Sequence, residues 1–356
     1  MLVLAIALVV QVGDTLRIVD RPCGACALSI DTVAVLGDDD GPGMIRGSQV
    51  VVSRDASGRY LVGGATSAGT IAVFDSAGRF LRSVGRPGGG PGEYRRIWRI
   101  TTSNDGVVVT DDFAARHTLL TREFTFVRTI PATGGVPLSL VAGDSGRVLE
   151  SAGVRRGAHA GYALFFRDMN GTIRSRASAV RVRQRDDGRD PASRALSLSP
   201  DGALAWAAHR DEYLLERCSF RTATCAVLSR SVEWFPPRRE LAASFDERMA
   251  RFPPSPELLG VAQEGERRLW VMSLVADERW RRGMVLGGAH PGVSDPHRYW
   301  DTVIEAIDLS QFAVVARRRV DEALLWGPLV GGYTALYTED ADGVPRILVL
   351  RLALRD

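Results

Sequence analysis

Residues 71–110 decide the fold of this chain, and they read IAVFDSAGRFLRSVGRPGGGPGEYRRIWRITTSNDGVVVT. Apolar runs at 71–74 and 80–84 flank a turn that ends in Gly78. A second pair of apolar runs follows the glycine-rich segment 85–92 and is split by Asn-Asp-Gly. Runs of β-branched and aromatic residues around glycine-containing turns are typical of β-hairpins. The stretch therefore predicts four strands, joined by two tight turns and one long connector.

The same pattern occurs one unit earlier in the chain. Gly37 and Gly58 align with Gly85 and Gly106, in both cases 48 positions further on. A Gly-Pro-Gly triplet falls between the two glycines of each unit, in almost the same register. Internal repeats of about this period indicate solenoids, propellers or arrays. Two unrelated glycine-rich loops would not share three anchors in this way.

Strand–turn–strand units recur six times along the chain. Their first turns lie at Ser57-Gly58, Asp105-Gly106, Ser145-Gly146, Asp201-Gly202, Glu264-Gly265 and Gly331-Gly332. Six units of four strands, with almost no helix pattern, predict an all-β, six-bladed β-propeller. The last unit lacks its fourth strand, so we expect residues 29–36 to complete the C-terminal blade and close the ring.

Composition restricts the classes of function. The chain has 356 residues, 45% of them apolar, and a net charge of +3 that gives no sign of a nucleic-acid partner. All 45 basic residues are arginine, which excludes Schiff-base chemistry and a phosphate loop ending in Gly-Lys-Ser/Thr. We expect a single propeller domain over residues 13–356, acting as a monomer.

The first ten residues, MLVLAIALVV, are uniformly apolar. They are too short to span a bilayer, which takes about 20 residues. They resemble the apolar core of a secretory signal that lacks its basic leader. We therefore interpret residues 1–12 as a truncated signal segment and expect an exported protein, periplasmic or extracellular, with no membrane span in the mature chain. A buried first strand is the alternative.

The four cysteines form two close pairs, Cys23 with Cys26 and Cys218 with Cys225. An even number of cysteines beside an export-like leader favours disulfides. Cys218 and Cys225 also flank a predicted hairpin turn. Zinc would need the two pairs, about 190 residues apart, to converge. A redox role for Cys-Gly-Ala-Cys has no βαβ pattern to support it.

The segment GRYLV…TIAVFDSAGRFLRSVGRPGGGPGEYRRI, followed by GVVVTDDFAARHTLL, resembles the NHL-repeat type of six-bladed propeller over about residues 28–130. Asp111 and Arg116 match the family's Asp/Arg pair, although the first unit lacks that pair. Phe74-Asp75 and Gly78 match its hairpin. Gly-Pro-Gly-Glu-Tyr and the N-terminal Cys-x-x-Cys resemble exported bacterial six-bladed propellers. The resemblance implies a binding scaffold, in a family that includes enzymes and non-enzymes.

Two insertions interrupt the repeats and supply candidate sites. Residues 238–252 carry apolar residues at spacing four between proline pairs, which predicts a short helix. Residues 277–300 form a long loop rich in arginine and aromatic residues. Strand alternation places both insertions, the glycine-rich connectors and residues 180–194 on one rim of the ring, where functional loops gather. The candidate ligand-binding residues are Arg282, His297, Arg298, Trp300, Arg116 and Asp112, which suit an anionic or carbohydrate-like ligand.

Each candidate also has a structural interpretation. The long loop could simply pack its tryptophans on a blade edge, and Asp111 could form an ion pair with Arg116 inside the blade. Residues 88–92 follow a strand but open no helix, which favours a tight connector over an anion cradle. His117 fits a strand. The acidic run 38–40 and Asp111-Asp112 could hold a hard cation, yet asparagines are too few and badly placed for the metal sites of gluconolactonase-like propellers.

We therefore expect a non-catalytic binding module for a small molecule, a glycan or a protein, with no resident metal or cofactor. The alternative is a propeller lyase or hydrolase that acts on a carbohydrate-like or lactone substrate, with or without a metal. No Gly-x-Ser-x-Gly or His-Glu-x-x-His motif favours that alternative.

Overall fold

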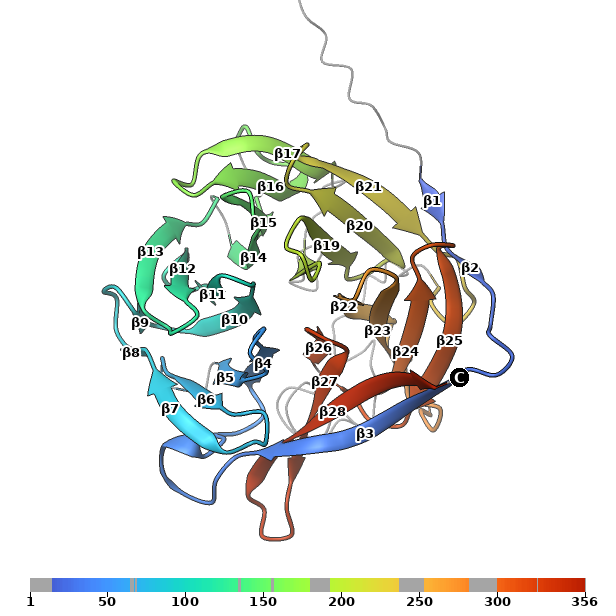
Figure 1. Ribbon diagram of the computed structural model, residues 1–356, viewed down its shortest axis with the longest axis horizontal. Helices are drawn as coiled ribbons and strands as arrows, with labels where there is room; N and C mark the ends of the chain where they lie inside the picture. The colour runs from blue at the N-terminus through green and yellow to red at the C-terminus, as the bar shows by residue number, and fades with distance from the viewer. Residues whose placement is uncertain are drawn as a thin grey trace, which may run out of the picture.

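The computed structural model describes residues 15–64, 67, 69–133, 136–154, 157–179, 193–236, 253–281, 300–324 and 326–355. Within these residues the chain forms six large sheets, which are arranged as blades around a central axis, and one small two-stranded sheet (Figure 1). The predicted all-β, six-bladed propeller is therefore confirmed.

The first three blades are four-stranded meanders whose first strand lies nearest the axis. The first blade contains β4 (Val50–Arg54), β5 (Tyr60–Gly64), β6 (Ile71–Phe74) and β7 (Phe80–Val84). The second contains β10 (Ile97–Thr102), β11 (Gly106–Asp111), β12 (Arg116–Thr121) and β13 (Phe126–Pro131). The third contains β14 (Val136–Ala142), β15 (Arg147–Gly153), β16 (Tyr162–Asp168) and β17 (Ile173–Ala179).

The other three blades repeat this order. The fourth contains β18 (Arg194–Leu198), β19 (Leu204–His209), β20 (Leu214–Ser219) and β21 (Thr224–Ser229). The fifth contains β22 (Glu257–Glu264), β23 (Arg268–Ala276), β24 (Trp300–Asp308) and β25 (Ala313–Val320). The sixth contains β26 (Trp326–Leu329), β27 (Tyr333–Glu339) and β28 (Pro345–Arg355), and takes its fourth strand, β3 (Ala27–Leu36), from the N-terminal part of the chain.

The strand β3 closes the ring. It pairs antiparallel with β28, and Leu36 lies opposite Ile347. Leu36 is fully buried while its neighbour Val35 is exposed, as the two-residue period of a strand with one buried face requires. Closure by residues 29–36 is thus confirmed.

The residues before β3 add a fifth strand to two neighbouring blades. β1 (Leu16–Arg17) pairs in parallel with β21, and β2 (Val19–Asp20) pairs in parallel with β25. Residues 16–36 therefore follow the outer edges of the fourth, fifth and sixth blades (Figure 1), and we call them the N-terminal belt. The sequence did not predict β1 and β2, because two residues are too few to show an alternating pattern.

The hydrophobic core fills the seams between blades. Trp206 of the fourth blade packs in one cluster with Leu258 and Leu269 of the fifth. Val62 of the first blade similarly packs with Val349 of the sixth. Burying a large apolar side chain contributes about 1.5–3 kcal/mol, so each blade depends on its neighbours for stability.

An Asp-x-x-Gly turn recurs in the ring. In the β6–β7 turn, Asp75 Oδ1 accepts hydrogen bonds from the backbone N–H groups of Ala77 and Arg79, each at 2.9 Å. Gly78 has φ of +88°, and a Cβ there would lie 2.3 Å from the carbonyl oxygen of Val35, so only glycine fits. The same side-chain bonds occur at Asp55, Asp168 and Asp340.

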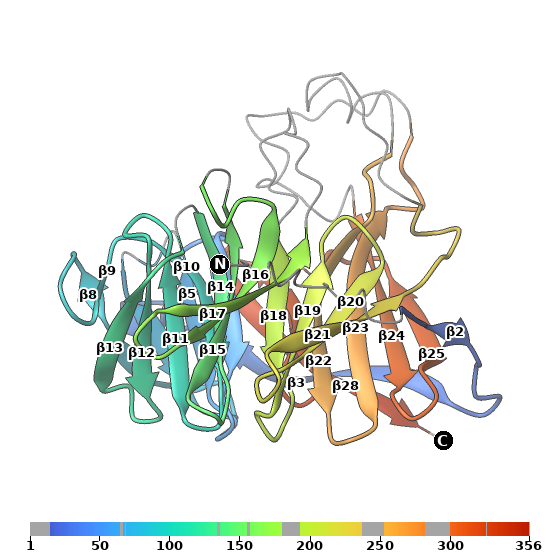
Figure 2. The same ribbon diagram turned by 90° about the horizontal axis from the view of Figure 1, so that it is seen from above.

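The two rims of the ring carry different connections (Figure 2). The turns between first and second strands and between third and fourth strands share one rim, the lower one in Figure 2. The second-to-third loops and the connectors between blades share the opposite one, which we call the loop rim. The six predicted first turns lie where expected. Residues 180–192, 237–252 and 282–299, including the helix predicted over 238–252, lie outside the described residues.

Candidate functional site

The six candidate ligand-binding residues are divided between two blades. Arg282, His297 and Arg298 lie outside the described residues, and Trp300 opens β24 of the fifth blade, where it is half-buried. Asp112 and Arg116 lie in the second blade. The second and fifth blades are opposite one another in a six-bladed ring, so the structure does not bring Trp300 together with Asp112 and Arg116.

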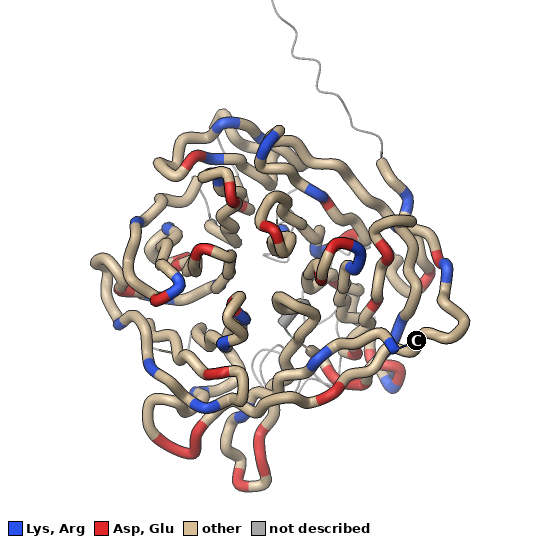
Figure 3. Tube along the Cα trace, in the orientation of Figure 1, with Lys and Arg blue, Asp and Glu red and all other residues tan. Residues whose placement is uncertain are grey.

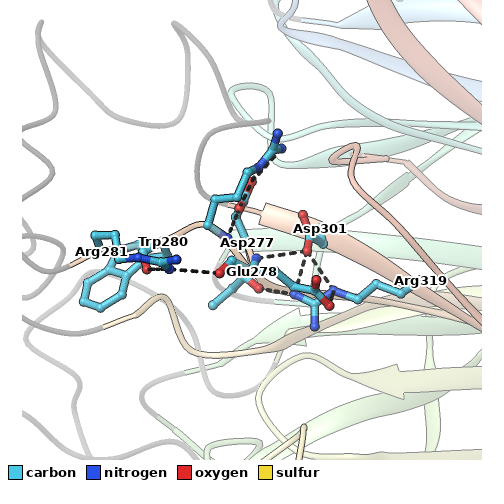
Figure 4. Close-up of polar contacts among 8 residues, drawn as sticks. Asp277, Glu278, Trp280, Arg281, Asp301 and Arg319 are labelled. Carbon is cyan, nitrogen blue, oxygen red and sulfur yellow. Dashed lines mark hydrogen bonds and ion pairs between the residues drawn. The ribbon is translucent and has the colours of Figure 1, made fainter.

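The base of the long loop in the fifth blade is held by polar contacts (Figure 4). Asp301 accepts a hydrogen bond from the Arg319 Nε at 2.7 Å and one from the backbone N–H of Glu278 at 3.2 Å. Arg281 donates to the carbonyls of Glu278 and Trp280. The residues that lead into residues 282–299 therefore already have structural partners.

Asp111 and Arg116 both make structural contacts, but they do not form the predicted ion pair with each other. They are neighbours in register across β11 and β12. Asp111 accepts hydrogen bonds from the backbone N–H groups of Arg95, Arg96 and Ala114. A carboxylate with three backbone donors is satisfied without a guanidinium, so Arg116 is free to bond elsewhere.

Arg116 instead holds the glycine-rich connector. Its guanidinium donates to the carbonyl oxygens of Gly89, Gly90 and Glu93, at 2.7–3.2 Å. The Glu93 carboxylate in turn accepts from the backbone N–H of Gly90 at 2.7 Å. The short parallel pair β8 (Arg86–Pro87) and β9 (Glu93–Tyr94) completes the loop. Residues 88–92 are therefore a tight connector, as the sequence favoured.

Asp112 organises an aromatic cluster on the loop rim. It pairs with the Arg96 guanidinium through two hydrogen bonds, one of 2.7 Å from Nε. That guanidinium lies 4.0 Å from the ring centre of Phe113 and 5.8 Å from that of Trp98. The bond to Asp112 raises the pKa of Arg96, so this arginine stays charged and fixed. Phe113 and Trp98 are 63% and 44% exposed, which places two large rings in solvent.

A β-bulge in β10 determines where Trp98 points. Ile97 pairs with Asp111 and Arg99 with Thr110, which leaves Trp98 as the extra residue. Ile97 and Ile100, three positions apart, both pack in the core cluster shared with the first blade. Bulges re-aim side chains in this way. Trp98 and Arg99 therefore both turn away from the first blade, although a regular strand would put them on opposite faces.

The Arg99 side chain makes no hydrogen bond or ion pair within the part of the chain that the structure describes. It is half-buried on the strand nearest the axis. Burial lowers the pKa of Arg99, and the charge of Arg210 lowers it further. Arg210 follows β19 of the fourth blade and pairs with Glu257 at 2.7 Å. The third blade lies between the second blade, which carries Arg99, and the fourth blade, which carries Arg210.

The acidic runs do not form a metal centre in the described residues. Asp111 and Asp112 are occupied as above, and Asp39 pairs with Arg346, which also lies 2.9 Å from Asp340. Figure 3 shows these two acidic loops close together at the edge of the ring. Over the same described ranges, no three His, Cys, Asp or Glu side chains gather as metal ligands.

Both predicted disulfides are present. Cys218 and Cys225 are opposite residues of β20 and β21, and Cys23 bonds to Cys26 in the N-terminal belt. Paired cysteines persist in oxidising compartments. Among the described residues, we find no helix with the length and apolar character needed to cross a membrane.

Comparisons with known proteins agree with this architecture. The model of the DUF5128 family, described as a 6-bladed beta-propeller, matches residues 49–124. None of the curated proteins matches the chain. An exported protein of Bacteroides fragilis is similar in structure, with a TM-score of 0.62 and 12% identity over 96% of this chain and 100% of its own. A DUF4221 protein of Bacteroides vulgatus has a TM-score of 0.63 and 6% identity, over 92% and 99% of the two chains. At these identities the likeness shows the fold alone.

The cluster of Trp98, Arg99 and Phe113 was missed from the sequence. The run IWRITT reads as one regular strand, in which Arg99 would share the face of Ile97 and lie on the opposite face from Trp98. One available sign was the spacing of Ile97 and Ile100, because three positions do not fit the two-residue period of a strand. This irregularity could have indicated the bulge.

Proposed function

We propose that this protein is a non-catalytic binding module, exported from the cytoplasm, that holds its ligand on the loop rim close to the axis. The observation that carries the proposal is the pair of exposed rings, Trp98 and Phe113, held beside the innermost strand by Arg96. Neighbouring apolar side chains left in solvent on a rigid scaffold are typical of interaction sites. The two disulfides and the exported structural neighbour support the location.

The bonding of the carboxylates favours binding over catalysis. A hydrolase or lyase needs a carboxylate or imidazole that is free to move a proton, or a metal. Asp111, Asp112 and Asp301, which lie on the loop rim, serve as acceptors in structural contacts. His117 is completely buried. These four groups are therefore engaged in the structure of the rim, which favours binding over proton transfer by them.

Arg282, His297, Arg298 and Trp300 remain part of this proposal as candidate contacts from the fifth blade. Trp300 opens β24 of the fifth blade, so a ligand that reaches across the axis, such as a glycan or a peptide, would contact that blade as well as the second. Kinship with NHL-repeat propellers is likewise proposed, on the sequence pattern around Asp111.

A thermal-shift screen with sugars, sugar acids and organic acids tests the proposal. The double variant Trp98→Ala/Phe113→Ala should lose the response to any hit. The matched control is Asn104→Ala/Asn170→Ala, which changes exposed turn residues of the opposite rim. Loss of binding in the control alone, with both proteins folded, would contradict the proposed rim. Mass spectrometry of the recovered ligand should find it unchanged, and its conversion to product would favour an enzyme.

A further inference from the structure

The charge at Arg99 has a consequence for the kind of ligand. A half-buried guanidinium with no partner among the described residues keeps five donors available. Burial and the nearby Arg210 both disfavour its positive charge. An anion placed against Arg99 would relieve both effects, because planar carboxylates and phosphates accept two parallel hydrogen bonds from a guanidinium.

Arg96 has a different part in the cluster. Its two bonds to Asp112 neutralise it and fix its plane. It therefore cannot supply a second anion-binding group, but it supports the rings of Phe113 and Trp98. An exposed ring supported in this way presents a flat apolar surface on which another flat group can stack.

The bulge in β10 places the anion-binding guanidinium of Arg99 and the exposed ring of Trp98 on the same face of the blade. Trp98 and Arg99 are consecutive and both turn away from the first blade. An anion bound by Arg99 would therefore lie beside the Trp98 ring, within the reach of one small molecule.

We infer that the loop rim binds an anion that carries a flat apolar face. Arg99 binds the anionic group, and Trp98 stacks on the flat face. This inference rests on the proposed function and adds the chemical class of the ligand. An aromatic carboxylate and an acidic sugar both have this chemistry.

Calorimetric titration with two matched pairs of probes tests the inference. Cinnamate is compared with the neutral cinnamamide, and galacturonate with the neutral galactose. We expect at least one of the two anions to bind about tenfold or more tightly than its neutral partner, because hydrogen bonds to charged groups are worth that much. Binding of cinnamate but not galacturonate would indicate that the ligand is an aromatic carboxylate. Binding of galacturonate but not cinnamate would indicate an acidic sugar.

Variants assign the effect to residues. Arg99→Gln should remove the preference for the anion over its neutral partner. Trp98→Leu should weaken the binding of both probes to the same extent. Arg95→Gln is the matched control for charge, because Arg95 is exposed and has no side-chain partner among the described residues. Phe126→Leu is the control for an exposed ring, since Phe126 lies on the outer strand β13.

The inference is overturned if neither anion binds, if the neutral probes bind as tightly, or if folded Arg99→Gln binds the anion like the unaltered protein. The comparison of probes on the unaltered protein stays decisive if Arg99→Gln fails to fold. A neutral ligand that binds at the loop rim and depends on Trp98 would refute the anion preference and leave the proposed function standing.

Discussion

His117 Nε2 lies 3.1 Å from Glu150 Oε1, in the seam between the second and third blades, and both side chains are completely buried. Thr110 Oγ1 lies 3.0 Å from the other ring nitrogen of His117, and Arg167 also pairs with Glu150. Hydroxyl, imidazole and carboxylate follow one another as in hydrolase triads. Because no substrate can reach a fully buried hydroxyl, the network fixes the seam rather than performing chemistry.

Replacing Glu150 should be strongly destabilising. Burial alone would raise the pKa of Glu150, but the hydrogen bonds and charges of His117, Arg167 and Thr133 outweigh it and hold that pKa below its usual value. Glu150→Gln leaves the buried Arg167 without a counter-charge, which costs about 3–5 kcal/mol for buried pairs. Urea unfolding measures the loss.

The control for this variant is Arg79→Gln, which removes an exposed pair with Asp75. Pairs of this kind contribute little, and we expect no measurable change in the free energy of unfolding. Equal effects of the two substitutions would contradict the structural role of the seam network.

Acid should destabilise the ring through its Asp-x-x-Gly turns. Backbone hydrogen bonds from Arg79, Thr172 and Val344 are the largest cause that holds the pKa values of Asp75, Asp168 and Asp340 below their usual range. A carboxyl whose pKa is lower in the folded than in the unfolded state stabilises the folded protein at pH values above the unfolded-state pKa. This stabilisation is lost as the pH falls through the folded-state pKa. Unfolding free energy should therefore be flat above about pH 5 and decline below about pH 4. Asp75→Asn/Asp168→Asn should reduce that slope, and an unchanged slope would refute the assignment.

Deletions within the N-terminal belt should have graded effects. Removing residues 1–21 takes away β1 and β2 but keeps β3, so the ring should close with lower stability. Removing residues 1–37 also takes away β3 and leaves the whole length of β28 as an open edge. Open edges promote aggregation. Size-exclusion chromatography with light scattering should find the first protein monomeric and the second aggregated. A soluble, folded second protein would show that the ring closes without β3.

The disulfide between Cys218 and Cys225 should make a modest contribution to the stability of the folded protein. It closes a short loop, with a sequence separation of 7, for which chain entropy gives about 2–3 kcal/mol or less. Cys218→Ala/Cys225→Ala should lower the unfolding free energy by this amount. The Cys23–Cys26 disulfide closes a still shorter loop. Cys23→Ala/Cys26→Ala should therefore lower the unfolding free energy by less. Thiol titration of the unreduced protein that finds Cys218 and Cys225 free would contradict the assignment of this disulfide.

Features with a repeating local cause were predictable from the sequence. Each first turn is specified by glycine at a fixed place, as in Ser57-Gly58, and the closing strand followed from a count of strands. The N-terminal strand β3 shows an alternation long enough to recognise. These signals depend only on near neighbours in the chain.

Features that depend on register or on the partner of a side chain were not predictable. Asp111 and Arg116 are opposite one another in the register of β11 and β12, yet they do not bind each other. Asp111 accepts from backbone N–H groups, and Arg116 donates to backbone carbonyl oxygens. The exposed site depends on one extra residue in β10, which re-aims Trp98 and Arg99. The sequence named Asp112 as a site residue, but its partner Arg96 and the rings that Arg96 supports emerge only in three dimensions.

The N-terminal belt also sets the order in which the molecule can assemble. Residues 16–36 are synthesised before any blade, yet their partners β21, β25 and β28 are among the last strands to be made. These N-terminal strands therefore stay unpaired until their partner strands have been synthesised. The native ring therefore cannot close before β28 has been synthesised.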